Sequence, residues 1–165
     1  MQGPGEPLRP PAPSELADDL PSLPDDLARI DQALRDSVRT PDPFLAEVAT
    51  HLIGAGGKRL RPTLTLCASY ASTDGAGRPG APDSVTGAVA CELVHLGSLY
   101  HDDVIDEAVT RRGVPSVNAR WSNIVAILAG DFLLARASSL AASLPCSLCG
   151  IGSFSWPAPQ PLRCS

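Results

Sequence analysis

The sequence predicts an all-α fold, and three observations support that class. Apolar residues recur every three or four positions through several segments, which is the spacing of one face of a helix. No stretch sustains the alternation of apolar and polar residues that indicates a half-buried strand. Proline and glycine gather between the periodic segments, where they begin and end helices.

The first two helices are expected between residues 24 and 54. Pro24 suits the first turn of a helix, because the N–H that it lacks would have no partner there, and the apolar pattern after it continues to Val38. A second, shorter pattern begins at Phe44 and ends after Ile53 at a group of glycines. Both segments are predicted to be amphipathic helices that bury one face.

Four more helical segments are expected, over residues 61–70, 83–106, 115–121 and 124–144. The longest follows a polar, glycine-rich loop, and Asp83 or Ser84 is expected to cap it with a side-chain oxygen. A turn at Arg111-Arg112-Gly113 separates this helix from the next segment.

The helices are predicted to form one domain over residues 25–144, flanked by two segments of different composition. Residues 1–24 contain seven prolines and few apolar residues, so a disordered leader is expected. Residues 145–165 contain four prolines, three of the five cysteines and no periodic pattern, so an unstructured tail is expected. A metal or redox role for the tail's C-x-x-C pair is not expected, since only one further cysteine and no histidine lie nearby.

Composition argues against two classes of function. The net charge of −5 argues against a nucleic-acid surface, because a polyanion requires a local surplus of Lys and Arg. No segment approaches the roughly 20 apolar residues of a membrane span, and no apolar signal core precedes Pro24. A cytoplasmic protein without a membrane span is therefore expected. Cys67 and Cys91 lie within helical patterns, where a buried thiol acts as a small apolar side chain, and no disulfide is expected.

Four carboxylates fall within six residues at the end of the longest helix: Asp102, Asp103, Asp106 and Glu107. Like charges four residues apart cost roughly 0.2–0.5 kcal/mol, and acidic groups beside the negative end of a helix dipole cost roughly 0.3–1 kcal/mol more. Asp102 and Asp106 lie about 40° apart around the helix, and His95 falls on the same face. Mg²⁺ would reverse the cost, because it binds one or two carboxylates together with phosphate oxygens. A solvated acidic helix end is the alternative.

The glycine-rich loop of residues 54–61 combines backbone amides with the fixed charges of Lys58 and Arg61, as a phosphate-binding site does. It is not a Walker loop, which needs Ser or Thr after its lysine and a preceding strand. Taken alone, the loop would be explained as a helix end with solvated bases. The pair Arg111-Arg112 would likewise be explained as a surface turn.

In their order and spacing, these segments resemble the trans-isoprenyl diphosphate synthase (polyprenyl synthetase) family. Residues 56–62 resemble its basic loop, and residues 102–106 resemble its first aspartate-rich motif. Further similar segments are residues 107–113, 115–119 and 128–131. The similarity extends over about residues 27–144, which implies the N-terminal part of the isoprenoid synthase helical bundle.

The resemblance implies a Mg²⁺-dependent prenyltransferase that adds isopentenyl diphosphate to an allylic diphosphate. It implies that four residues hold isopentenyl diphosphate: Lys58, Arg61, His95 and Arg112. Asp102 and Asp106 would bind Mg²⁺ that bridges the allylic diphosphate. Asp103 would support them, and Arg111 would contact that diphosphate directly. The intact family member is expected to be a homodimer.

Product length in this family depends on the positions four and five residues before the first aspartate, which here are Ser98 and Gly97. Short-chain enzymes place bulky aromatic residues there. Two small residues therefore predict a long-chain polyprenyl diphosphate, although Tyr100, deeper in the pocket, is a residue that would shorten the product.

The sequence departs from the family after Asp131, its last acidic residue, so it has no second aspartate-rich motif there. A C-terminally truncated chain that is inactive alone is therefore expected. The alternatives are a noncatalytic partner or regulatory subunit of a complete synthase, and a cation or diphosphate binder without chemistry. Truncation would expose apolar residues, and four are expected to be open: Ile124, Leu128, Phe132 and Leu133.

Overall fold

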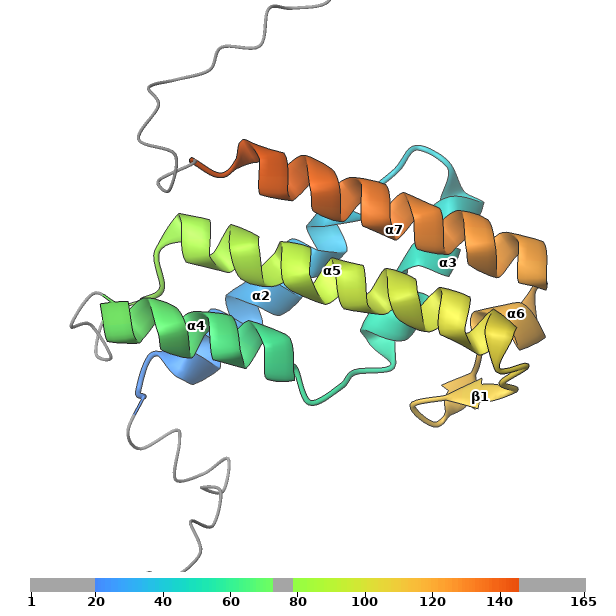
Figure 1. Ribbon diagram of the computed structural model, residues 1–165, viewed down its shortest axis with the longest axis horizontal. Coiled ribbons are helices and arrows are strands. Elements are labelled where there is room, and N and C mark those ends of the chain that lie inside the picture. The colour runs from blue at the N-terminus through green and yellow to red at the C-terminus, as the bar shows by residue number, and fades with distance from the viewer. Residues whose placement is uncertain (1–19, 73–78, 146–165) are drawn as a thin grey trace, which may run out of the picture.

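The computed structural model describes residues 20–72 and 79–145, and within these ranges the chain is almost wholly helical (Figure 1). The helices are α2 (Leu23–Ser37), α3 (Pro43–Gly54), α4 (Leu60–Ser72), α5 (Pro82–Ile105), α6 (Val117–Arg120) and α7 (Asn123–Ser143). This confirms the predicted all-α class. Two very short strands, β1 (Thr110–Arg111) and β2 (Val114–Pro115), pair antiparallel around the expected turn.

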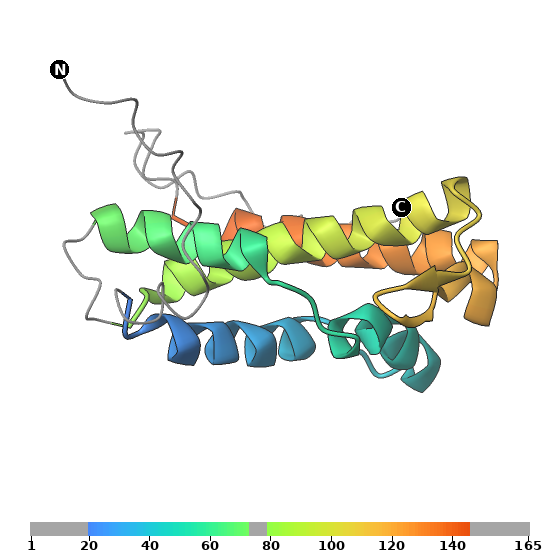
Figure 2. The same ribbon diagram turned by 90° about the horizontal axis from the view of Figure 1, so that it is seen from below.

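The helices lie in two layers. Helices α2 and α3 form one layer, and α4, α5 and α7 form the other (Figure 2). Helix α5 contacts α2, α4, α6 and α7, so it is the centre of the bundle. The hairpin and α6 lie beyond the C-terminal end of α5, beside the start of α7 (Figures 1 and 2).

Helix starts follow local capping chemistry in two cases and depart from the expected caps in a third. At α3, the Asp42 carboxylate accepts hydrogen bonds from two backbone N–H groups of the first turn, at 2.9 and 3.1 Å, and Pro43 follows it. At α7, the Ser122 side chain accepts from the N–H of Val125. The expectation that Asp83 or Ser84 caps α5 is wrong, because Pro82 already stands in the first turn, after Ala81.

The predicted leader and tail lie mostly outside the described residues. Residues 20–24 are described, and Leu23 and Pro24 already belong to α2, so the helix starts slightly earlier than the predicted domain boundary. Leu23 is buried in the core, which explains why the helix includes it. Residues 1–19 and 146–165 lie outside the described ranges, and the C-x-x-C pair lies there too.

A buried carboxylate ties the start of α2 to the far end of α4 and to the segment before α5. Asp26 accepts hydrogen bonds from the Tyr70 hydroxyl at 2.6 Å, from the Gly80 N–H at 2.5 Å and from the Arg29 guanidinium at 2.5 Å. Burial alone would raise the pKa of Asp26, but these three donors outweigh it and lower the pKa. The Asp26 carboxylate therefore stays ionised, and its hydrogen bonds connect the two layers of helices.

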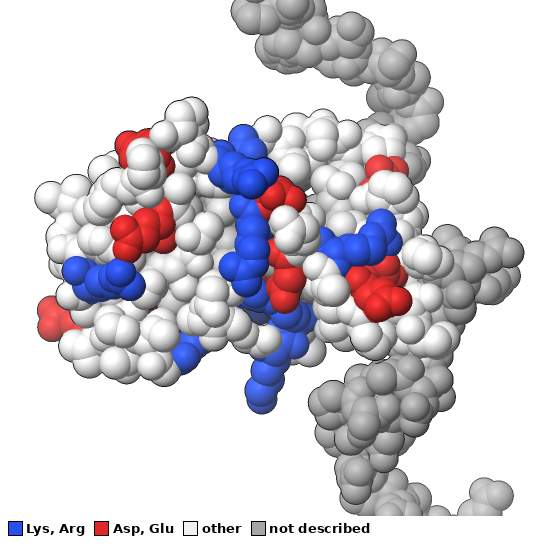
Figure 3. Space-filling model, turned by 180° about the vertical axis from the view of Figure 1, so that it is seen from behind, with Lys and Arg blue, Asp and Glu red and all other residues white. Residues whose placement is uncertain are grey.

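Charges of both signs lie side by side on the opposite face of the molecule from Figure 1. A band of Lys and Arg crosses that face, with Asp and Glu beside it (Figure 3). The band is thus interrupted by acidic groups rather than being a surface of one sign.

Helices α5 and α7 cross closely at two glycines. A Cβ atom on Gly97 would lie 3.0 Å from the carbonyl oxygen of Gly130 and 3.0 Å from Leu134. A Cβ atom on Gly130 would lie 2.4 Å from Nε2 of His101. Small residues at these positions therefore allow the two helix backbones to approach.

Helix α7 corrects two expectations. By length and composition it is apolar enough to cross a membrane, with 21 residues and a mean hydropathy of 1.7, so the expectation that no segment reaches this limit is wrong. Leu133 is fully buried at 0% exposure, against the expectation that it is open. Ile124 and Leu128 are exposed as expected, at 70% and 62%, and Phe132 is half-buried.

We predict that Gly130→Ala lowers the free energy of unfolding by about 1–2 kcal/mol. The new methyl group must displace the His101 ring, and that loss exceeds the modest gain in helix propensity. Urea unfolding followed by circular dichroism measures the change. Gly54→Ala is the matched control, because no atom lies within 4 Å of its Cβ position and no loss is expected there. Equal stabilities for Gly130→Ala and the parent chain would contradict the packing argument.

Candidate active site

The three aspartates at the end of α5 lie in two different environments. Asp102 and Asp106 are exposed, and among the described residues no ion pair reaches either one. The backbone N–H of Asp106 donates to the carbonyl of Asp102 at 2.8 Å, so the two residues are one helical turn apart, as the spacing predicts. Asp103 is completely buried, at 0% exposure.

Asp103 is committed to the hairpin. Its Oδ1 atom accepts from Arg111 Nε at 2.7 Å and from Arg111 Nη2 at 2.5 Å. The hydrogen bond from Arg111 to this carboxylate raises the pKa of Arg111 above its ordinary value, although partial burial opposes the change. Asn118 also donates to the Asp103 carbonyl, at 3.1 Å. Asp103 therefore fixes the hairpin to the end of α5. Two nitrogen donors of Arg111 are used in this contact.

The basic loop between α3 and α4 has a strained backbone. Gly56 and Gly57 have φ values of 78° and 152°, and Arg59 has a φ of 46°, in the left-handed region that favours glycine. Lys58 is exposed at the centre of this loop, and Arg61 is exposed in the first turn of α4. The loop thus presents two cations to solvent.

Arg112 reaches into this loop from the hairpin. Its Nη1 atom donates to the carbonyls of Leu52, at 3.3 Å, and Gly56. A Cβ atom on Gly57 would lie 2.9 Å from the guanidinium carbon, so only glycine permits this approach. Burial lowers the pKa of Arg112, an effect that the nearby Glu92 carboxylate opposes. Part of the donor set of Arg112 is therefore used to hold the loop.

Two residues of the site were missed by the sequence reasoning, Arg59 and Glu92. The Arg59 Nη1 atom lies 3.1 Å from Glu92 Oε1, and Arg59 Nε lies 2.7 Å from Asp31 Oδ1. Glu92 is only 2% exposed. A signal was present in the sequence, because Glu92 falls on the apolar stripe of its helix, three residues after Val89, where an unpaired charge is not tolerated.

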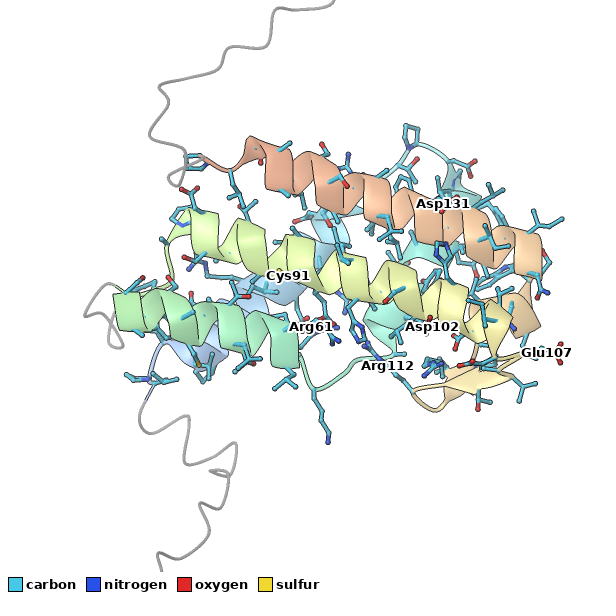
Figure 4. The ribbon with its side chains drawn as sticks, in the orientation of Figure 1. Arg61, Cys91, Asp102, Glu107, Arg112 and Asp131 are labelled. Carbon is cyan, nitrogen blue, oxygen red and sulfur yellow. The ribbon has the colours of Figure 1, made fainter. Side chains whose placement is uncertain are left out.

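His95 lies among the charged groups of the site and is half-buried. Burial lowers its pKa, the positive charge of Arg61 lowers it further, and the carboxylate of Glu92 opposes the change. The charges of Arg112 and Asp102 also act on it, in opposite directions. Figure 4 shows Arg61, Arg112 and Asp102 gathered between the start of α4 and the second half of α5. The structure thus brings the predicted basic and acidic residues together around His95.

The residues predicted to set product length lie apart from one another. Ser98 is half-buried, and its hydroxyl donates to the His95 carbonyl at 2.9 Å. Gly97 faces α7 at the close crossing described above, so its small size already has a packing cause. Tyr100 is fully buried and donates to the Val48 carbonyl at 2.7 Å. Its side chain is thus directed toward α3, and an effect of Tyr100 on product length stays a prediction.

An open groove of about 420 Å³ runs between α4 and α5, lined by Arg61, Leu64, Thr65, Cys91 and Val94. Its lining includes the exposed thiol of Cys91, which was expected to be buried. Cys67 is half-buried, and both thiols are free. The groove lies beside the N-terminal half of α5, and Arg61 at its edge belongs to the basic group around His95.

The carboxylates at the end of α5 could bind Mg²⁺ only together with oxygen ligands from another source, such as a phosphate group. Within the described ranges, no group of three or more His, Cys, Asp or Glu side chains is placed to hold a metal ion. Asp102 and Asp106 offer exposed carboxylate oxygens on one face, which is the donor type that Mg²⁺ prefers when phosphate oxygens complete its shell. The residues present therefore fit a cation shared with a diphosphate.

The helical bundle, with Arg61, Arg112 and Asp102 near one histidine, has the fold of isoprenoid synthases. Residues 42–155 match the family model described as polyprenyl synthetase, and the chain belongs to that family. It is 48% identical over 118 residues to the nonaprenyl diphosphate synthase of Mycobacterium tuberculosis, covering 72% of this chain and 34% of that protein. It is 43% identical over 122 residues to the heptaprenyl diphosphate synthase component 2 of Geobacillus stearothermophilus, covering 74% and 37%.

Solved structures agree with this assignment. The decaprenyl diphosphate synthase of Rhodobacter capsulatus matches with a TM-score of 0.68 and 39% identity, over 78% of this chain and 38% of that one. The polyprenyl synthase of Caulobacter crescentus, in complex with calcium and isoprenyl diphosphate, matches with a TM-score of 0.63 and 35% identity, over 77% and 35%. The chain thus spans about a third of the length of the relatives that it matches.

We predict that the His95 imidazole titrates below its ordinary pKa of 6.5, because burial and Arg61 disfavour its charged form. The unfolded chain then binds a proton more readily than the folded chain, so stability falls as the pH drops through about 6.5. NMR titration of the ring measures the pKa. Unfolding of His95→Gln at pH 7 and pH 5 is the control, and its stability is expected to fall less. A His95 pKa at or above 6.5 would contradict the prediction.

Proposed function

We propose that this chain provides the first Mg²⁺-diphosphate site of a prenyltransferase that extends an allylic diphosphate with isopentenyl diphosphate. The observation that carries the proposal is the pair Asp102 and Asp106, exposed and without ion-pair partners in the described part of the chain, beside the cations around His95. If these two carboxylates were paired with basic side chains, their negative charge would already be neutralised, and they would not attract a cation. An unpaired acidic face next to a basic loop is suited to a metal ion and the diphosphate that it bridges.

The residues divide into two groups by charge. Asp102 and Asp106 hold Mg²⁺, which supplies positive charge to the diphosphate leaving the allylic carbon. Lys58 and Arg61 are exposed donors for the diphosphate of isopentenyl diphosphate. Arg112 contributes the donors that the loop carbonyls leave unused, and His95 lies between the two groups.

Arg111 and Asp103 are proposed to act together. Arg111 adds positive charge near the allylic diphosphate while two of its nitrogen donors remain bound to Asp103. Asp103 is therefore a supporting residue rather than a metal ligand, since its side chain is buried. The contact between Asp103 and Arg111 fixes the position of the hairpin relative to the end of α5.

A long-chain product is proposed from Ser98, whose small side chain lies one turn before Asp102 on α5. The relatives support this, because their names include nonaprenyl and heptaprenyl diphosphate synthases. A homodimer for the intact protein and a cytoplasmic location remain proposals of the same kind.

A noncatalytic partner of a complete synthase is the second candidate. It is favoured by the exposed apolar residues of α7 and by a groove of about 280 Å³ between α3 and α7, lined in part by Phe44, Leu128 and Phe132. Some relatives are named as component 2 of heptaprenyl diphosphate synthase, a name that indicates more than one component. Co-purification with a full-length synthase would favour this candidate. Turnover of labelled isopentenyl and allylic diphosphates by this chain would favour the first, and would show the expectation of inactivity to be wrong.

We predict that inorganic pyrophosphate binds this chain in a Mg²⁺-dependent way, measured by isothermal titration calorimetry. Asp102→Asn or Asp106→Asn removes one charged oxygen ligand, and each is expected to weaken the Mg²⁺-dependent binding by about tenfold. Asp83→Asn, at the other end of α5, is the matched control and is expected to bind as the parent chain does. Binding that is unaffected by Mg²⁺, or by the two substitutions, would contradict the proposed site.

We predict that the equivalent of Ser98→Phe, introduced into an intact long-chain homologue, shortens the product. The aromatic ring would block the path along α5 that the growing chain follows away from Asp102. Chromatography of the labelled products measures chain length. The equivalent of Thr86→Phe, three turns nearer the start of α5, is the control and should leave length unchanged. An unchanged product from the first variant would remove the argument from Ser98.

A further inference from the structure

Glu92 is a buried carboxylate to which the proposed function gives no role. Its Oε1 atom lies 3.1 Å from Arg59 Nη1 and 3.9 Å from Arg112 Nη2. Arg59 is 9% exposed and Arg112 is 18% exposed, so two cations share one anion away from water. A buried carboxylate is costly unless charged donors surround it, and here they come from two separate segments.

Both arginines have an unfavourable backbone conformation. The φ values of Arg59 and Arg112 are 46° and 52°, and in the described ranges only Glu107 among the other non-glycine residues has a positive φ. Side chains rarely adopt such conformations, and they persist only where the surroundings determine them strongly. The shared contact with Glu92 is the feature that these two arginines have in common.

The position of Arg59 determines where its neighbours point. Lys58 and Arg61 flank it in the basic loop, and Arg59 Nη2 also donates to the Ile53 carbonyl at 3.2 Å. Arg112 is tied to the same loop through the carbonyls of Leu52 and Gly56. Asp31 also holds Arg59, at 2.7 Å, and Asp103 also holds the hairpin through Arg111, but Glu92 is the carboxylate that contacts an arginine from each of the two segments.

We propose that Glu92 is a positioning residue for diphosphate binding, the shared counter-ion that fixes Arg59 and Arg112 so that Lys58, Arg61 and Arg112 converge on one diphosphate. The inference rests on the proposed function, since the ligand is the diphosphate of that site. Glu92 does not touch the ligand. It acts through the two arginines.

The sign of one substitution separates positioning from bulk electrostatics. A negative charge near an anion site opposes binding, so charge alone predicts that Glu92→Gln binds pyrophosphate more tightly. Positioning predicts the opposite, because the amide keeps the size of the side chain but removes the negative charge that Arg59 and Arg112 share, and Asp31 then pairs with Arg59 alone. Calorimetry with Mg²⁺ and inorganic pyrophosphate is expected to show binding about tenfold weaker than that of the parent chain.

Glu47→Gln is the matched control, because Glu47 is exposed and pairs with Arg120 at 2.8 Å on the surface of α3. Binding by this variant is expected to equal that of the parent chain. Glu92→Asp keeps the charge and shortens the side chain by one methylene group. Weaker binding by Glu92→Asp supports positioning, and binding equal to or tighter than that of the parent by either Glu92 variant overturns it.

A measurement on the unaltered chain covers the case in which the variants do not fold. The Nη–H signals of Arg59 and Arg112 in a low-temperature ¹⁵N NMR spectrum are expected to exchange slowly without ligand, because Arg59 Nη1 and Arg112 Nη2 face Glu92. The Arg112 signal is expected to shift when pyrophosphate is added. Fast exchange of both signals overturns the inference. If the unaltered chain does not bind pyrophosphate, the proposed function fails, and the slow exchange still decides whether Glu92 holds the arginines.

Discussion

The burial of α5 on several sides is the constraint on which the rest of the structure depends. Helices α2, α4 and α7 all pack against it, and its close crossing with α7 requires glycine at residues 97 and 130. Because α5 is packed on several sides, the position of each polar residue around the helix determines whether its side chain is buried or exposed. Glu92 and Asp103 are enclosed with arginine partners, whereas Asp102 and Asp106 remain at the surface. The division between enclosed and exposed carboxylates on α5 is therefore a consequence of helix packing.

Adjacent residues on one helix illustrate this division. Asp102 and Asp103 are chemically identical, but they point about 100° apart around α5. One direction leads to solvent and the other leads to the hairpin, where Arg111 closes over the carboxylate. The hairpin in turn carries Arg112 to the basic loop. Asp103 is thus linked to the basic loop through the hairpin, while Asp102, on another face of the same helix, stays open to solvent.

Helix positions were largely predictable, because apolar spacing and Pro or Gly boundaries are local signals. The all-α class and the helices on both sides of residues 73–78 follow from that spacing. The start of α5 was predicted to within one residue, but its cap was not, since a proline in the first turn replaced the expected side-chain cap. The exposure of Cys91 and the burial of Leu133 were also missed. Both depend on which neighbouring helix covers which face, and spacing within one helix does not contain that information.

For the site, residue types were easier to predict than their partners. The exposed pair Asp102 and Asp106 follows from helical geometry. The ion pair of Glu92 with Arg59 joins residues 33 positions apart in sequence, with no local signal of pairing. The hydrogen bond of Tyr100 to α3 was not predicted, for a related reason. A residue near Ser98 in sequence lies on a different side of the helix, where it contacts α3.

The hydrogen-bonded cluster around Asp26 has a consequence for how the sequence can vary. It holds Tyr70 and Gly80 against the same carboxylate, and a hydrogen bond of 2.6 Å joins the hydroxyls of Ser69 and Ser84. The two ends of the intervening connection are therefore fixed independently of its length. Doubling a connection whose ends are already held costs only about 0.6 kcal/mol in closure entropy. Insertions, or a peptide tag, should be accommodated there without disturbing the bundle.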